Sequence, residues 1–144
     1  MPESKYGKYV VTDLKTPNFR PEFVEAYKKY ASRILWMDNN VVPGAFQMNC
    51  SWYLNPDTHE GKSHVHDVDE IIGFFSNDSK NPYELGGEIE FWLEDEKFLI
   101  TRSALIFIPA GMNHCPLIIR RANRPIFHFS VVTGGTYIQT KKGE

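Results

Sequence analysis

The stretch that decides the fold runs from Gly61 to Glu70 and reads Gly-Lys-Ser-His-Val-His-Asp-Val-Asp-Glu. His64, His66 and Glu70 stand at even spacings within it. Side chains on an extended backbone alternate with a period of two, so all three would leave the same face of a strand. Three polar groups that face one way must meet either water or a metal ion. An exposed polar face, with the two aspartates of the stretch beside it, is the plainer alternative.

A second short motif further along the chain supplies another histidine. Residues 108–114 read Ile-Pro-Ala-Gly-Met-Asn-His, so a Pro/Gly turn precedes His114 on a different strand. Its imidazole would be a fourth donor beside those of the first motif. Imidazole nitrogens with one carboxylate oxygen suit a divalent transition metal ion such as Fe, Mn, Zn, Ni or Co, and they suit Ca or Mg poorly.

The segments around both motifs read as short strands separated by turns. Alternation is clearest in residues 45–54, where Phe46, Met48, Cys50 and Trp52 alternate with polar residues and Tyr53. Many short strands with turns every eight to twelve residues predict an all-β antiparallel sandwich or small barrel. The expected strands cover residues 34–37, 45–54, 71–75, 88–93, 98–100, 104–108, 117–119 and 126–132.

One helix is expected before these strands, from Pro21 to about Arg33. Apolar residues recur there at helical spacing, and Pro21 suits the first position of a helix. We expect the helix to pack its aromatic stripe on the outside of the strands, with a pocket lid or an oligomer contact as the alternative. The stripe consists of Phe23, Tyr27, Tyr30, Ala31 and Ile34.

Composition excludes several classes of function. The chain has 144 residues, which suffice for one domain with a real core. Its 16 basic and 18 acidic residues give a net charge of −2 without a basic run, which argues against nucleic acid or an anionic membrane as a partner. Two cysteines make no disulfide framework, and no signal peptide or membrane-length apolar run is present. A cytoplasmic protein is expected.

At this point the two motifs carry a resemblance. The pair His64-x-His66-x-x-x-Glu70 and Pro109-x-Gly111-x-x-His114 resembles the two signature motifs of the cupin superfamily. The resemblance covers about residues 45–133. It implies a jelly-roll β-barrel in which His64, His66, Glu70 and His114 bind one metal ion. Ser103 and Ile118 stand where the family's second motif has a glycine and an asparagine, and these departures affect turns rather than ligands.

The resemblance also sets the expected organisation of the chain. Residues 1–40 would form an N-terminal extension whose helix packs on the barrel, residues 41–138 the cupin-like barrel, and residues 139–144 a tail. A homodimer is expected, because small barrels of this type commonly pair.

Other side chains are candidates for contact with a ligand. Gln47, Asn49 and Tyr53 share one face of a strand and could bind substrate, although the reverse facing is nearly as plausible. His128 alternates with Phe127 and Phe129. If those rings face outward, His128 points into the barrel, either as a general acid or base near its ordinary titration range or as a satisfied buried histidine.

Two further residues are assigned to other roles. Cys115 directly follows His114, so its side chain should point the opposite way on a strand and belong to the core. His59 stands in a polar segment and is expected on the surface.

Two functions remain open from the sequence. The first is a metal-dependent enzyme acting on a small organic molecule inside the barrel, with dioxygenase, isomerase, decarboxylase or lyase chemistry. The second is a noncatalytic cupin module that binds a sugar or another small effector. The absence of an evident output domain or DNA-reading helix in the sequence favours the enzyme.

Overall fold

The computed structural model describes residues 4–57 and 62–134. His59 and the expected tail 139–144 lie outside these residues. One short 3-10 turn, η1, spans Gly7–Tyr9, and the helix α1 spans Pro21–Lys28. The strands are β1 (Ala31–Met37), β2 (Gln47–Tyr53), β3 (Glu70–Phe75), β4 (Glu84–Leu93), β5 (Glu96–Arg102), β6 (Ala104–Ile108), β7 (His114–Ala122) and β8 (Ile126–Val132).

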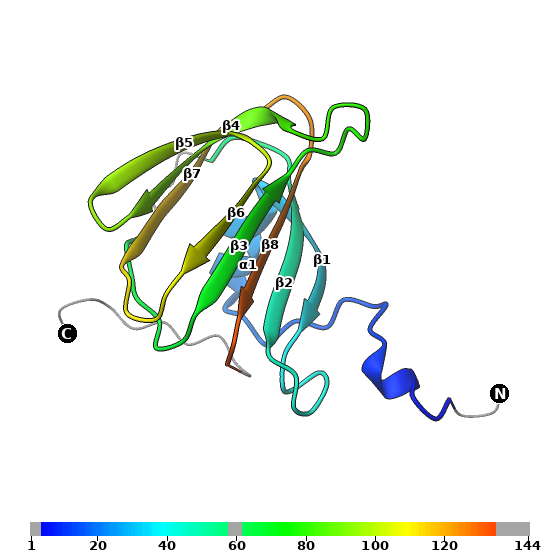
Figure 1. Ribbon diagram of the computed structural model, residues 1–144. Helices are drawn as coiled ribbons and strands as arrows, with labels where there is room; N and C mark the ends of the chain where they lie inside the picture. Colours follow the sequence, from blue (N-terminus) through cyan, green and yellow to red (C-terminus); the bar gives the residue numbers. More distant parts are fainter. Residues whose placement is uncertain (1–3, 58–61, 135–144) are drawn as a thin grey trace.

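The strands form two antiparallel sheets (Figure 1). One has five strands in the order β1-β2-β8-β3-β6, and the other has three in the order β5-β4-β7. Strands distant in sequence therefore lie side by side, as β8 does between β2 and β3. This arrangement confirms the all-β jelly roll with one helix that the sequence predicts.

The core lies between the two sheets. Phe74 and Ile108 from the larger sheet and Phe91 and Ile119 from the smaller one have at most 1% of their surface exposed. They belong to one continuous apolar cluster. Alternate residues of β2, β3 and β8 point into this layer, as the period of a strand requires.

The helix is shorter than the sequence predicts. It begins at Pro21 as expected but ends at Lys28, and Ala31 and Ile34 lie in β1. The prediction of a helix to about Arg33 is therefore wrong. The apolar residues at helical spacing favour a helix only locally. Residues of β1 are extended instead, because they form a ladder of hydrogen bonds with β2.

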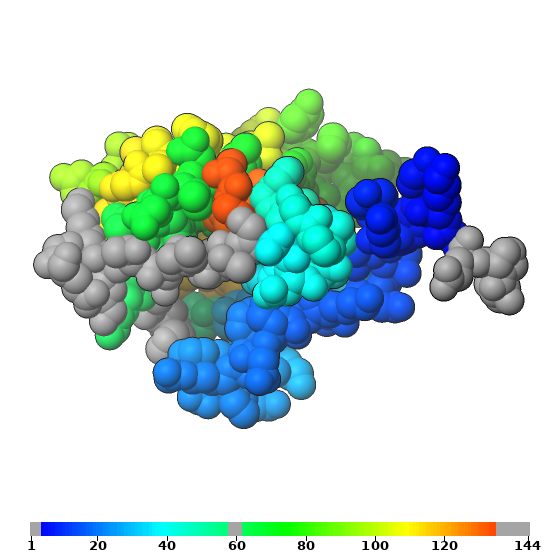
Figure 2. Space-filling model, turned by 90° about the horizontal axis from the view of Figure 1, so that it is seen from below, coloured from blue at the N-terminus to red at the C-terminus, as the bar shows by residue number. Residues whose placement is uncertain are grey.

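Helix α1 covers the inner face of the larger sheet near β1 and β2. Its Tyr27 hydroxyl donates a hydrogen bond to Ser51 Oγ on β2 at 2.5 Å, and the Tyr30 ring packs edge-on against Tyr53. In Figure 1 the helix lies behind this sheet, and in Figure 2 its blue surface lies opposite the yellow residues of β6. Tyr27 and Tyr30 of the expected stripe therefore pack against β2, whereas Phe23 is 60% exposed.

Strand β1 carries a bulge. Its register against β2 shifts between Arg33 and Leu35, so that Arg33 pairs with Ser51 while Trp36 pairs with Asn49. A bulge adds one residue and breaks the alternation of faces. Arg33 and Trp36 therefore both reach the interior, although they are three positions apart and would face opposite ways on a regular strand. No helix among residues 4–57 and 62–134 is long and apolar enough to cross a membrane.

Candidate metal centre and adjoining cavity

The two histidine motifs are joined by backbone hydrogen bonds. His64 and His114 form an antiparallel bridge in which each N–H donates to the other's carbonyl, at 3.0 and 2.9 Å. Gly111 has a positive φ of 84°, which glycine adopts without strain, and its N–H donates to the carbonyl of His66 at 2.9 Å. The Pro/Gly turn therefore fixes His114 relative to the first motif.

The first motif is not one continuous strand. Only His64 and Val65 form a bridge, the next residues bend, and β3 begins at Glu70. Asp69 stabilises the bend, since its carboxylate accepts the N–H of Ala110 at 2.9 Å and its carbonyl accepts the N–H of Thr133 at 3.2 Å. Asp69 is thus part of the scaffold rather than merely a solvated neighbour.

The four side chains expected at a metal site converge in the interior, each at most 8% exposed. Donor atoms of His66, Glu70 and His114 lie within 4.8 Å of one another. Glu70 Oε1 is 3.3 Å from His66 Nε2 and 3.2 Å from His114 Nε2. The ring of His64 lies 4.4 Å from that of His114 and 4.9 Å from that of His66, centroid to centroid.

The Nδ1 atoms of two of these histidines contact backbone carbonyls. His64 Nδ1 lies 3.0 Å from the carbonyl of Lys62, and His114 Nδ1 lies 3.1 Å from that of Met112. A carbonyl can only accept, so in each ring Nδ1 carries the proton and Nε2 of the neutral imidazole has a free lone pair. Backbone carbonyls orient metal-binding histidines in this way.

Charge in the cluster is held at the carboxylate. Burial raises the pKa of Glu70, but its close contacts with the rings of His114 and His66, at 3.2 and 3.3 Å, outweigh burial and bring the pKa to about 2. Burial lowers the pKa of His64 to about 4, against the opposing hydrogen bond to Lys62 and with the other two imidazoles adding to the decrease. A neutral His64 beside an ionised Glu70 is the protonation state that metal binding requires.

Cys115 does not follow the expected alternation. Its φ is positive, at 79°, and its Sγ lies within 4.8 Å of donor nitrogens of His64 and His114. The prediction that its side chain points away from the histidines is therefore wrong, because a residue in this conformation does not continue the alternation of β7. Burial raises the pKa of this thiol to about 12.

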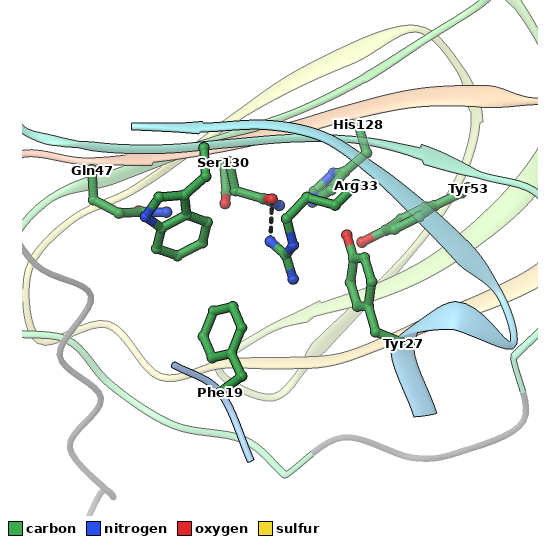
Figure 3. A pocket seen from close by; sticks show the side chains of 9 residues that line it. Phe19, Tyr27, Arg33, Gln47, Tyr53, His128 and Ser130 are labelled. Atoms are coloured by element: carbon green, nitrogen blue, oxygen red, sulfur yellow. Dashed lines mark hydrogen bonds between the residues drawn. The ribbon is translucent and has the colours of Figure 1, made fainter. Parts of the chain in front are cut away.

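A cavity of about 240 Å³ is lined by residues of α1, β1, β2 and β8 and by Phe19 (Figure 3). Gln47, Asn49 and Tyr53 line it, each at most 8% exposed, so the inward facing of this set is confirmed. Trp52 is only half-buried on the opposite face of β2. Tyr53 keeps its phenolic proton, since burial raises its pKa well above the ordinary value.

His128 also lines the cavity, between the rings of Tyr53 and Phe74 at centroid distances of 4.5 and 5.1 Å. Its Nδ1 lies 3.1 Å from the carbonyl of Gly73, which leaves Nε2 as an acceptor. Burial lowers its pKa to about 4. His128 thus points inward as expected, but its pKa lies below the ordinary titration range of histidine.

Sequence reasoning missed Arg33, the one cationic side chain among the described residues that line this cavity. The residue was assigned to the end of the helix, and no motif marks it. The bulge that turns it inward has no signature in a single sequence.

Comparison with known proteins supports the fold. The sequence matches no protein-family model and no curated protein. Among solved structures, an oxalate oxidase in complex with the substrate analogue glycolate matches with a TM-score of 0.57 and 12% identity, over 99% of this chain and 68% of its own. A recombinant oxalate oxidase in complex with glycolate gives 0.56 and 13%, over 93% and 63%.

An oxalate decarboxylase of Lactobacillus farciminis matches with a TM-score of 0.51 and 15% identity, over 74% of this chain and 30% of its own. The chain therefore spans less than two thirds of the length of two of these three structures. At such identities the likeness concerns the fold. The chain has the cupin fold.

Proposed function

We propose that this protein is a metal-dependent enzyme of the cupin class that acts on a small organic substrate inside the barrel. The contact between His114 Nε2 and Glu70 Oε1, at 3.2 Å, carries the proposal. With Nδ1 committed to the carbonyl of Met112, Nε2 of the ring faces a carboxylate oxygen. These two atoms at this distance in a buried site need either a proton or a metal cation between them, and the further imidazoles gathered beside them favour the metal.

In this proposal His64, His66, Glu70 and His114 bind one divalent transition metal ion. Three imidazoles and a carboxylate fit Fe, Mn, Zn, Ni or Co. The bound ion would supply Lewis-acid or redox chemistry to a substrate, which covers dioxygenase, isomerase, decarboxylase and lyase reactions. The oxidase and decarboxylase named among the similar structures are consistent with this range.

The chain's own residues bind and orient the substrate. Gln47, Asn49 and Tyr53 offer an amide, a second amide and a protonated phenol to the cavity. His128, neutral at pH 7 with Nε2 as an acceptor, takes a hydrogen bond or a proton from the substrate.

Metal content tests the ligand assignment. We expect purified protein to contain about one equivalent of a transition metal, and His64→Ala and His114→Ala to lose most of it, since removing one donor typically lowers affinity by orders of magnitude. His128→Gln is the matched control, being equally buried outside the cluster, and it should retain metal. Elemental analysis of the four proteins makes the comparison.

Turnover separates an enzyme from a binding module. Wild-type protein with and without a chelator, incubated with a panel of small organic acids and followed by mass spectrometry, should convert a substrate only with metal. Equal metal in wild type and His64→Ala would refute the ligand set. Ligand binding that survives chelation without any turnover would favour the noncatalytic effector-binding module.

A further inference from the structure

Arg33 stands in a cage of aromatic rings inside the cavity. Its guanidinium carbon lies 4.3 Å from the ring centroid of Tyr27 and 5.3 Å from those of Phe19 and Trp36. Figure 3 shows its side chain extending into the space between Phe19 and Tyr27. Within residues 4–57 and 62–134 no carboxylate forms an ion pair with it. A half-buried cation without an anion is unusual unless an anion comes from outside.

Among the described residues, one N–H of Arg33 has a hydrogen-bond partner. A guanidinium has two faces on which rings can stack, and its five N–H groups point outward in its plane. One of them donates to Asn49 Oδ1, the interaction drawn dashed in Figure 3. The indole N–H of Trp36 donates a hydrogen bond to the Asp38 carboxylate at 3.0 Å, which fixes the orientation of the Trp36 ring. The remaining donors match the two oxygens of a planar carboxylate.

Gln47 gives a second, independent observation. Its side chain is 1% exposed and lines the same cavity, and its Oε1 has no hydrogen-bond partner among the described residues. An unpaired buried amide costs on the order of 1–3 kcal/mol. Rotation of the amide by half a turn would instead present its NH2 group to an anion. The position therefore favours a polar ligand.

The sheet places Gln47 two strands away from Glu70 of the proposed metal centre. Gln47 on β2 pairs with Val132 on β8, and Val132 pairs with Glu70 on β3. Neighbouring strands lie about 4.8 Å apart, so Gln47 and Glu70 are about 10 Å apart along the sheet. Gln47 therefore lies at the end of the cavity nearer to Glu70, whereas Arg33 pairs with Ser51 further along β2.

We propose that the cavity binds a small organic carboxylate whose carboxylate group pairs with Arg33 and bonds Gln47. The rings of Phe19 and Trp36 contact its apolar part. That this molecule is the substrate rests on the proposed function, whereas its binding does not require the metal.

Calorimetric titration of the full chain after chelation tests the pairing. The probes are benzoate, phenylacetate and malonate, each beside its neutral amide. We expect at least one acid to bind at least tenfold more tightly than its amide, and Arg33→Met to abolish that preference. Arg33→Lys keeps the charge without the planar fork and should retain part of it. Arg102→Met is the matched control, since Arg102 also stacks on a ring, that of Tyr83 at 5.2 Å, outside the cavity.

The outcomes distinguish this inference from the proposed function. Acids and amides binding equally, no acid binding below about 10 mM, or a preference that survives Arg33→Met would each overturn the carboxylate site. If Arg33→Met is unfolded by circular dichroism, Gln47→Leu replaces it and should weaken the acid but not the amide. If His114→Ala loses the metal but keeps the preference for the acid, the result supports both the metal site and the carboxylate site. If His114→Ala keeps the metal and the preference, the result refutes only the metal ligands.

Discussion

His128 is a buried imidazole whose protonation couples the interior to pH. Its pKa is lowered from 6.5 to about 4 by burial, with Gly73 and Glu70 opposing the decrease and Arg33 adding to it. The unfolded chain binds a proton near pH 6.5 and the folded chain near pH 4, so the stabilisation is complete above pH 6.5 and is lost as the pH falls through 4. The difference amounts to about 3 kcal/mol.

The prediction concerns the slope of stability with pH. In chelated protein, the free energy of unfolding in urea should fall between pH 6.5 and 4 in wild type, and it should fall less steeply in His128→Gln. His64, whose pKa is also about 4, contributes to both proteins alike. Identical slopes in the two proteins would contradict a neutral, buried His128.

Single residues also show where sequence reasoning succeeds. The even spacing of His64, His66 and Glu70 and the turn before His114 identified the residues that converge, but the prediction that the first three share one strand is wrong, because the chain bends between His66 and Glu70. Cys115 and Arg33 were misplaced for a shared reason. A positive φ at one and a bulge at the other break the alternation on which strand reasoning depends.

At the scale of elements, the contact between β4 and β7 depends on Gly87. A Cβ there would lie 2.3 Å from the backbone oxygen of Arg121, which cannot move without separating the strands. We expect Gly87→Ala to lower the free energy of unfolding by about 3 kcal/mol. Gly73→Ala is the control, since its Cβ meets only ring atoms of Phe129, which can move, and the cost should be about 1 kcal/mol. Urea unfolding compares the two; an equal or inverse order would show that β7 yields more readily than the ring.

Elements differ in how far a sequence determines them. Strands flanked by turn residues, such as β2 and β8, were predicted nearly to their ends. The helix was extended into β1, because Tyr30, Ala31 and Ile34 continue a helical spacing that only the ladder with β2 overrides. Long-range pairing is the information that a local pattern lacks.

Apolar side chains are exposed on the outer side of the larger sheet, on β3 and β6. We name this surface the outer apolar face and define it by Ile71, Leu105 and Phe107, which are 39%, 65% and 57% exposed. Ile71 and Phe107 are cross-strand partners on β3 and β6, and β6 is an edge strand with an unpaired backbone. Exposed apolar residues gathered beside an open edge favour association with another chain.

We expect a second copy of this chain to cover the outer apolar face in a homodimer. A lysine at its centre would have to lose its hydration on association, so Phe107→Lys should weaken the dimer by about a hundredfold or more. Sedimentation velocity over a concentration series measures the shift. Leu99→Lys is the matched control, an equally exposed apolar residue at 54% on β5 of the smaller sheet, and it should leave the dimer intact. A wild-type protein that stays monomeric at every concentration would exclude the dimer. A dimer that only Leu99→Lys disrupts would place the interface on the smaller sheet.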